Sequence, residues 1–146
     1  TLADLRRVRA AIGAARDTAP TRVLFVTIDP ARDTDARLAE YIGRFGPGVI
    51  ALNGSAGAIR TFADQFRVKY EIAGNGKATK GGYLFDHTAS VSLVGPDARL
   101  YAVFTLPLRT QAVANDVLRI HAKHRADLCP NVSGRHHTLT CIAKTV

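Results

Sequence analysis

Two aspartates and one histidine stand where an α/β sheet can hold functional groups. Asp29 and Asp33 follow a continuous apolar run over residues 23–28. They should therefore lie at the carboxyl end of a parallel strand, the edge where open α/β sheets place their sites. Asp33 can equally serve a structural role as a helix cap. His87, preceded by Asp86, begins a later expected strand, but a lone histidine there is usually a surface or hydrogen-bonded residue.

A second group of metal-ligating residue types lies in the last part of the chain. It reads C-x6-H-H-x3-C, from Cys129 through His136 and His137 to Cys141. This spacing does not fit the paired ligands of the usual structural zinc sites. A disulfide between the two cysteines is an alternative in an oxidising compartment. The histidines just before this stretch lie in the last turn of an expected helix, where they interact favourably with the helix dipole. We expect the tail to bind no metal.

The composition indicates an ordinary globular domain with a basic surface. Of the 146 residues, 47% are hydrophobic and 22% are charged. No stretch approaches the roughly 20 apolar residues of a membrane helix, and no signal-peptide pattern is visible. The net charge of +8 comes from scattered residues that are not interleaved with aromatic stacking platforms. We therefore expect no nucleic-acid partner, whereas attraction to an acidic protein fits this charge.

Apolar periodicity and turn residues predict an alternating order of helices and strands. Long segments with helical spacing are separated by short β-branched runs, and glycine or proline ends most of them. The expected order is a helix at 2–16, a strand at 23–28, a helix capped at 33–35, a strand at 49–52, a helix opened by Ser55, a loop or hairpin at 74–82, strands at about 88–94 and 99–104, and a helix at about 110–124.

Three short segments form an ordered set of motifs. Residues 26–34 read VTIDPARDT, residues 45–54 read FGPGVIALNG, and residues 86–88 read DHT before a strand and a Gly-Pro-Asp turn. They resemble the V-T-[VI]-D-P-x-R-D-T, F-x-P-x-[FV]-I-x-L-x-G and D-H-[ST] motifs of the Sco/SenC family. With the intervening elements the resemblance covers about residues 1–121.

The resemblance implies a copper site. In this family copper lies between two thiolates of a C-x-x-x-C-P motif and the imidazole of the D-H-[ST] histidine, so His87 is the implied metal ligand here. Thiolates select copper(I), and an imidazole completes a site that can also hold copper(II). Asp86 is then expected to orient or tune the ring, and Asp29 to line the metal loop.

The start of the chain bears on the two thiolates. In the family, Pro and Thr follow the second cysteine, and then comes the helix that begins here at Thr1. The resemblance thus places the cysteine pair a few residues before Thr1, and neither Cys129 nor Cys141 matches it. Because the chain begins at a helix and contains no methionine, we expect a fragment. One imidazole is not a copper site, so stable copper binding by this chain alone is not expected.

The implied fold is an α/β, thioredoxin-like domain that lacks the N-terminal strands preceding the cysteine motif. In such a sheet the strand before the cysteines lies between the strands at 22–28 and 88–94. Its absence would leave buried backbone groups unpaired on two facing edges, which is costly. The two strands could pair directly, another segment could fill the gap, or the domain could be unstable. Residues 138–143 alternate like a strand, and we expect them to pair somewhere in the sheet.

The function implied by the resemblance is that of a metallochaperone rather than an enzyme. The full-length protein would carry copper to the dinuclear copper site of cytochrome c oxidase, or would keep the cysteines of that site reduced. Its partner would be the copper-bearing oxidase subunit or another copper chaperone. Its location would be the periplasm, with a membrane anchor upstream as an option. Residues 1–124 would form the domain and 125–146 an unassigned tail. Two alternatives stay open: a thiol–disulfide oxidoreductase, which needs a thiol pair of depressed pKa, and a degenerate binding domain without metal.

Overall fold

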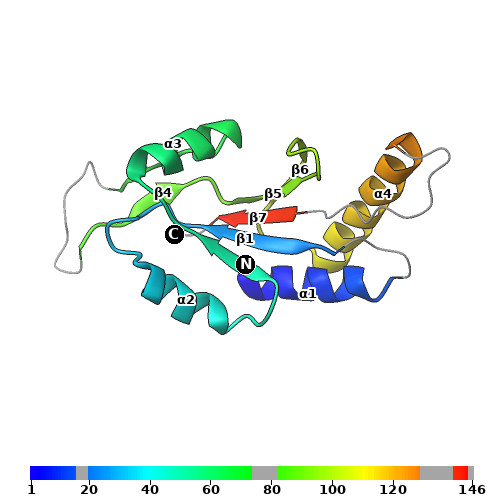
Figure 1. The fold of residues 1–146 in the computed structure, drawn as a ribbon, viewed down its shortest axis with the longest axis horizontal. Coiled ribbons are helices and arrows are strands. Elements are labelled where there is room, and N and C mark those ends of the chain that lie inside the picture. Colours follow the sequence, from blue (N-terminus) through cyan, green and yellow to red (C-terminus); the bar gives the residue numbers. More distant parts are fainter. Residues whose placement is uncertain (16–19, 74–81, 129–139, 145–146) are drawn as a thin grey trace.

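A mixed sheet with helices on both faces organises the chain (Figure 1). The computed structural model describes residues 1–15, 20–73, 82–128 and 140–144. The main sheet has the strand order β2-β1-β7-β5-β6, and β3 and β4 form a separate antiparallel pair. The elements are α1 (Leu2–Gly13), β1 (Arg22–Val26), α2 (Asp35–Gly43), β2 (Val49–Leu52), α3 (Ala56–Gln65), β3 (Tyr70–Ile72), β4 (Phe85–His87), β5 (Ser90–Val94), β6 (Leu100–Thr105), α4 (Thr110–Leu128) and β7 (Thr140–Lys144).

Local sequence explains where the helices begin. Thr34 precedes α2, and its hydroxyl accepts a hydrogen bond from the amide of Arg37 at 3.3 Å. Ser55 does the same for α3, with 3.2 Å to the amide of Ala58. Each cap satisfies one of the amides that a helix start leaves unpaired. Of the three residues expected to cap α2, Thr34 is therefore the cap.

Helices α1, α2 and α4 cover one face of the sheet, and α3 covers the other (Figure 1). The buried residues of α1 recur every three or four positions and form one stripe, as the helical period requires. On the α1 face this stripe packs against both β1 and β5, and on the opposite face α3 packs against the same two strands. The α1 stripe consists of Leu2, Leu5, Val8 and Ile12.

Strand β7 fills the position between β1 and β5. It pairs parallel with β1, from Arg22 opposite Thr140 to Val26 opposite Lys144. On its other side it pairs antiparallel with β5, where Leu93 lies opposite Cys141. The expectation that a late segment pairs in the sheet is confirmed for Thr140–Lys144, whereas residues 138 and 139 lie outside the described part of the chain.

Several boundaries differ from the sequence-based expectation. Helix α1 ends at Gly13 rather than near residue 16, and α4 continues to Leu128. The strand expected at 23–28 ends at Val26, because the chain then turns into the loop before α2. The β3–β4 pair was not predicted as two strands. The expected loop at 74–82 lies outside the described residues except for Gly82.

Candidate functional site

The loop that leaves the carboxyl end of β1 is held by a buried threonine. The Thr27 hydroxyl donates to Asp33 Oδ2 at 2.5 Å and accepts a hydrogen bond from the amide of Asp29 at 2.9 Å. Thr27 is 1% exposed, so both bonds lie largely away from water. Asp33 thus fixes the turn before α2 through Thr27, which corrects the expectation that it caps the helix.

Asp29 joins this loop to the segment before β4. Its Oδ2 pairs with Nε of Arg32, and its Oδ1 accepts a hydrogen bond from the Tyr83 hydroxyl at 2.8 Å. Arg32 also donates to the Tyr83 carbonyl at 2.8 Å and stacks over the Tyr83 ring, with its guanidinium carbon 4.0 Å from the ring centroid. We call Asp29, Arg32 and Tyr83 the latch.

The electrostatics of the latch follow from the Asp29 carboxylate. Its hydrogen bond raises the pKa of Tyr83 above the ordinary value, and desolvation of the phenol acts in the same direction. The same carboxylate raises the pKa of Arg32, against the opposing effect of desolvation. A phenol that donates to a carboxylate resists losing its proton, since the phenolate would face a like charge. The latch therefore keeps Tyr83 protonated and Arg32 charged.

His87 ends β4 and is half-buried. Its Nδ1 lies 3.1 Å from the carbonyl oxygen of Thr88. A carbonyl oxygen accepts hydrogen bonds only, so Nδ1 carries the proton and Nε2 of the neutral ring keeps its lone pair. This is the tautomer in which an imidazole can bind a metal through Nε2.

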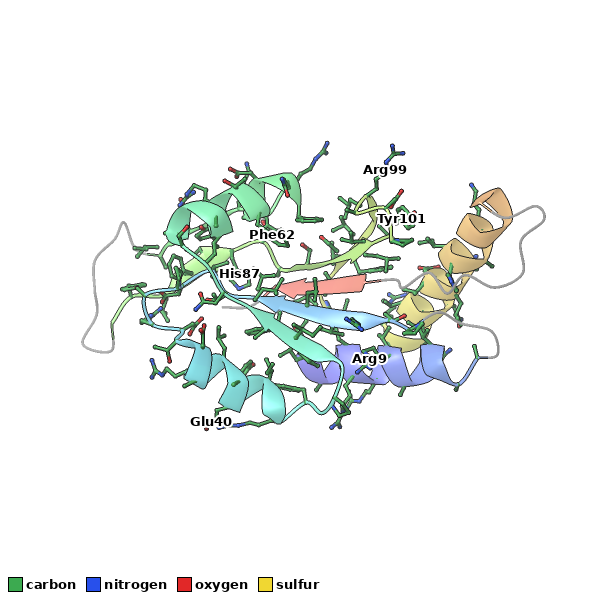
Figure 2. All side chains as sticks on the ribbon, viewed as in Figure 1. Arg9, Glu40, Phe62, His87, Arg99 and Tyr101 are labelled. Carbon is green, nitrogen blue, oxygen red and sulfur yellow. The ribbon has the colours of Figure 1, made fainter. Side chains whose placement is uncertain are left out.

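The D-H-T motif also fixes the backbone on both sides of this ring. The Thr88 amide donates to the Lys69 carbonyl at 2.9 Å, and the Lys69 amide donates to the Thr88 hydroxyl at 3.1 Å. These bonds extend the β3–β4 pairing, in which His87 lies opposite Tyr70. Figure 2 shows His87 on the side of the molecule that carries α2 and α3, away from α4.

Asp86 lies on the other face of this small sheet from His87, because side chains alternate along a strand. It is exposed and stands opposite Glu71. The ring orientation of His87 comes from the Thr88 carbonyl, and Asp29 is engaged by the latch. The roles expected for Asp86 and Asp29 toward a metal stay predictions. Arg32 and Tyr83 were not singled out from the sequence, although Arg32 belongs to one of its motifs.

An open cavity of about 420 Å³ lies beside the latch. It is bounded by the loop after β1, the first turn of α3 and the β3–β4 pair, and Asp29 and Phe85 both line it. Arg60 of α3 lies over the Tyr70 ring at 5.0 Å from its centroid. The cavity therefore has an aromatic wall, and charged side chains of both signs, Asp29, Arg60 and Glu71, line it next to the latch.

The donors for a complete metal site are not assembled in the described part of the chain. Within residues 1–15, 20–73, 82–128 and 140–144, no group of three histidine, cysteine or acidic side chains could hold a metal ion. Cys129 lies outside these residues, and Cys141 is aligned with the middle of β5. His87 alone offers an open imidazole nitrogen in the expected motif. Over the same residues, none of the helices has the length and apolar character needed to cross a membrane.

Comparison with solved structures identifies the fold. Arabidopsis thaliana ScoI with copper bound matches with a TM-score of 0.70 at 25% identity, over 84% of this chain and 73% of that chain. Bradyrhizobium japonicum ScoI with copper bound matches with a TM-score of 0.66 at 28% identity, over 82% and 73% of the two chains. The expected thioredoxin-like α/β fold is thereby confirmed.

Sequence comparison gives the same relationship. The protein named SCO2 homolog, mitochondrial, of Bos taurus is 31% identical over 109 residues, which is 75% of this chain and 40% of that protein. The chain spans 31% to 40% of the length of three curated relatives that it matches. The SCO1/SenC family model matches residues 1–122. With the motifs at 26–34, 45–54 and 86–88 all inside that match, the chain belongs to the SCO1/SenC family.

Proposed function

We propose that this chain is the body of a copper metallochaperone in which His87 Nε2 supplies one copper ligand. The observation that carries the proposal is the bond from His87 Nδ1 to the Thr88 carbonyl, which leaves Nε2 as the free lone pair. Family membership adds support, since two of the matching solved structures are described as ScoI with copper bound. Copper is the cargo of this function, so its binding must be reversible.

The chemistry of the proposal needs two thiolates beside the imidazole. Copper(I) prefers soft sulfur ligands, and an imidazole together with two thiolates also suits copper(II). The family resemblance assigns these thiolates to a C-x-x-x-C motif adjoining Thr1. The chain as given supplies the imidazole and the fold that positions it, and we expect it to bind copper weakly.

The decisive experiment adds the missing ligands and then removes the imidazole. The coding sequence upstream of Thr1 is read, and the chain is expressed with its native residues before Thr1. Copper(I) affinity is measured by competition with a chromophoric chelator for this extended protein and for its His87→Ala variant. Losing one of three ligands should weaken copper(I) binding at least tenfold, as losses of ligand-shell groups commonly do. Unchanged affinity would exclude His87 as a ligand.

A matched control lies on the same small sheet. Glu71→Gln removes a charge from the exposed face of β3, opposite Asp86, and should leave copper affinity unchanged. Asp86→Asn tests whether that carboxylate tunes the site. An effect between those of Glu71→Gln and His87→Ala would support the tuning role. If the upstream residues carry C-x-x-C and the protein reduces disulfides without binding copper, the oxidoreductase alternative replaces the chaperone.

The partner proposed for the copper-loaded protein is the copper-bearing subunit of cytochrome c oxidase or another copper chaperone. The basic surface, with a net charge of +8, suits an acidic face on that partner. For a bacterial source, the proposed location is the periplasmic side of the membrane. Copper transfer is measured by mixing the loaded protein with the apo partner domain. Transfer that does not slow as ionic strength rises would argue against electrostatic docking.

A further inference from the structure

Strands β3 and β4 form a pair that stands apart from the main sheet. An isolated pair of two strands has too little hydrogen bonding and packing to hold its own position in water. This pair carries His87, which lies opposite Tyr70. The position of the imidazole therefore depends on what fixes the β3–β4 pair to the rest of the domain.

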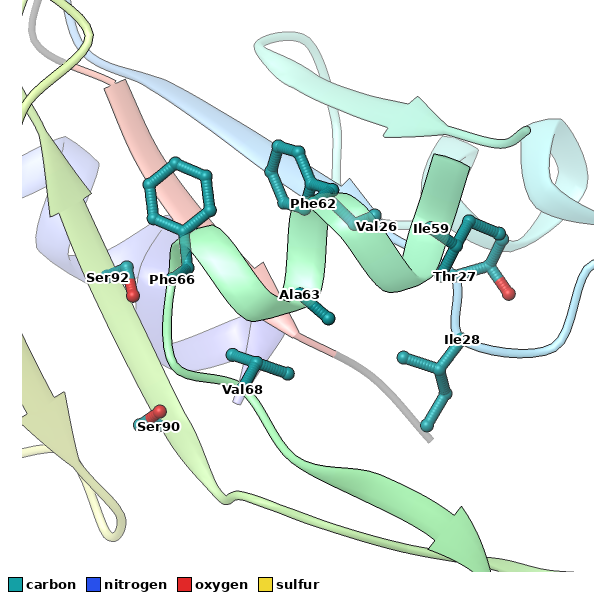
Figure 3. Close-up of a pocket in the computed structure, with 10 residues that line it drawn as sticks. All are labelled: Val26, Thr27, Ile28, Ile59, Phe62, Ala63, Phe66, Val68, Ser90 and Ser92. Atoms are coloured by element: carbon teal, nitrogen blue, oxygen red, sulfur yellow. The ribbon is translucent and has the colours of Figure 1, made fainter. Parts of the chain in front are cut away.

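The inner end of the β3–β4 pair is fixed by packing beside α3. Val68 precedes β3, and Ser90 follows β4 at the start of β5. Both line the same small cavity of about 20 Å³ as Thr27, which belongs to the loop after β1 (Figure 3). Ser90 and Thr27 are buried. Close packing at this cavity holds the points where the chain enters β3 and leaves β4.

The latch holds the outer end of the pair. The Ala73 amide donates to the Leu84 carbonyl at 2.8 Å, so the pairing of the two strands continues from β4 toward Tyr83. Arg32 donates to the Tyr83 carbonyl, and Asp29 accepts a hydrogen bond from the Tyr83 hydroxyl. Arg32 and Asp29 both belong to the loop after β1. The latch therefore ties the outer end of the pair to the carboxyl edge of the main sheet.

A row of aromatic rings joins the latch to the face of the pair that carries His87. Side chains two positions apart on a strand share a face, so Phe85 and His87 lie on the same side of β4. Tyr70, directly opposite His87, stands on that side too. The ring centroids of Tyr83 and Phe85 are 5.5 Å apart, and those of Phe85 and Tyr70 are 5.9 Å apart, both in the favourable edge-to-face arrangement. A displacement of Tyr83 is therefore passed to the two rings next to His87.

We propose that the latch positions the copper ligand: Tyr83 and Arg32 hold the β3–β4 pair in one orientation against the sheet, so that His87 Nε2 is offered to the metal at one point. This inference rests on the proposed function of His87. Tyr83 and Arg32 act through His87 as positioning residues and are not ligands. A ligand that is already in place loses little conformational freedom when the metal binds, and this raises the affinity. Copper(I) should therefore bind less tightly when the latch is broken, even with every ligand present.

The test is a double-mutant cycle on the extended protein that carries its native residues before Thr1. Tyr83→Phe removes the hydroxyl that bonds Asp29 and keeps the ring. Its copper(I) affinity, measured by competition with a chromophoric chelator, should fall about tenfold, as it does for residues that support metal ligands. In a His87→Ala background the same change should leave the affinity unaltered, because no imidazole remains to be positioned. Equal losses in the two backgrounds would overturn the proposal.

Tyr101→Phe is the matched control. Tyr101 is half-buried like Tyr83, and its hydroxyl hydrogen-bonds Asp97 in the turn between β5 and β6. Figure 2 shows Tyr101 beside β6, on the side toward α4 and away from His87. This variant should lower the free energy of unfolding by a similar amount and keep the copper affinity. A copper affinity lowered as much as in Tyr83→Phe would reduce the effect to general destabilisation and refute the positioning role.

A measurement without copper follows the β3–β4 pair itself. Amide exchange of the same extended protein is recorded by NMR at Ala73, which bonds Leu84 near the latch, and at Thr88, which bonds Lys69 at the inner end. Tyr83→Phe should speed exchange at both amides and leave the protection of β5 unchanged, because a local opening does not unfold the core. Tyr101→Phe should not speed exchange at either amide. Protection at Ala73 that stays the same in Tyr83→Phe would contradict the proposal.

The outcomes separate this inference from the proposed function. If His87→Ala leaves the copper affinity unchanged, the ligand assignment fails and the inference fails with it. Arg32→Met removes the second anchor, since it keeps the length of the side chain and loses the donors to Asp29 and to the Tyr83 carbonyl. If His87→Ala weakens copper binding while Tyr83→Phe and Arg32→Met do not, only the positioning role is excluded.

Discussion

Asp29→Asn tests the latch, since this change keeps the size of the side chain and removes its charge. Asp29 is 5% exposed, and each of its oxygens accepts from a separate donor. Hydrogen bonds that involve a charged group contribute about 1.5–3 kcal/mol each. The asparagine keeps one acceptor oxygen and turns an amide toward the other donor. The Arg32 side chain is 41% exposed, so water can rehydrate the guanidinium and the net loss should be about 2 kcal/mol.

The assay is urea unfolding followed by circular dichroism at neutral pH. A loss of about 2 kcal/mol corresponds to a melting temperature lower by roughly 4–8 °C for a domain of this size. Asp116→Asn is the matched control: Asp116 pairs with Arg119 at 2.5 Å on the surface, and exposed pairs contribute at most about 1 kcal/mol. The denaturant slope should stay constant, so that the midpoint alone reports stability.

Coupling to Tyr83 distinguishes the latch from a general effect of the aspartate. Tyr83→Phe removes the donor to Asp29 Oδ1, so it should destabilise the wild type more than the Asp29→Asn protein. Strictly additive losses, or an Asp29→Asn loss no larger than that of Asp116→Asn, would refute the reasoning that the carboxylate joins the two segments.

Three further predictions concern pH, packing and pairing. The hydrogen bond to Asp29 raises the pKa of Tyr83. The stability that this bond adds to the fold is therefore complete below the ordinary tyrosine pKa of about 10, and it is lost as pH rises through the folded value. A stability difference between wild type and Tyr83→Phe that persists unchanged in strong alkali would contradict this. Leu5→Ala, at a residue 1% exposed, should lower the free energy of unfolding in urea by about 2–5 kcal/mol. Leu84→Ala, at a residue 66% exposed, should lower it by less than about 1 kcal/mol. Equal losses would argue against the packing of α1 on β1 and β5. Ile142→Pro removes an amide donor from the centre of β7 and should destabilise the domain, because proline cannot donate to the sheet ladder. Amide-exchange protection in β1 should fall, and unchanged protection would show that β7 does not pair there.

Much of the secondary structure could be predicted from short windows of sequence. The α1 stripe follows the helical period, and Thr34 and Ser55 start helices through bonds to residues three positions along. Such features depend on contiguous residues, so periodicity detects them. The short β3–β4 pair escaped prediction because three-residue strands carry too few positions to show alternation. The His87 motif could be recognised, but the hydrogen bond that selects its tautomer could not.

Residues close together in the chain encode the family motifs and the periodicity of the helices, so these could be predicted from the sequence alone, and the D-H-T motif predicts His87 as a metal ligand. The partners of Asp29 depend on the folded chain, because Tyr83 lies 54 positions away in the sequence. The tertiary structure also decided that Asp86 lies on the opposite face from His87, and that β7 occupies the centre of the sheet. The physical reason is that strand pairing and side-chain partners are chosen by competition for unpaired buried groups. The outcome depends on which distant segments of the chain reach the same sheet edge, so it cannot be predicted from a local sequence pattern.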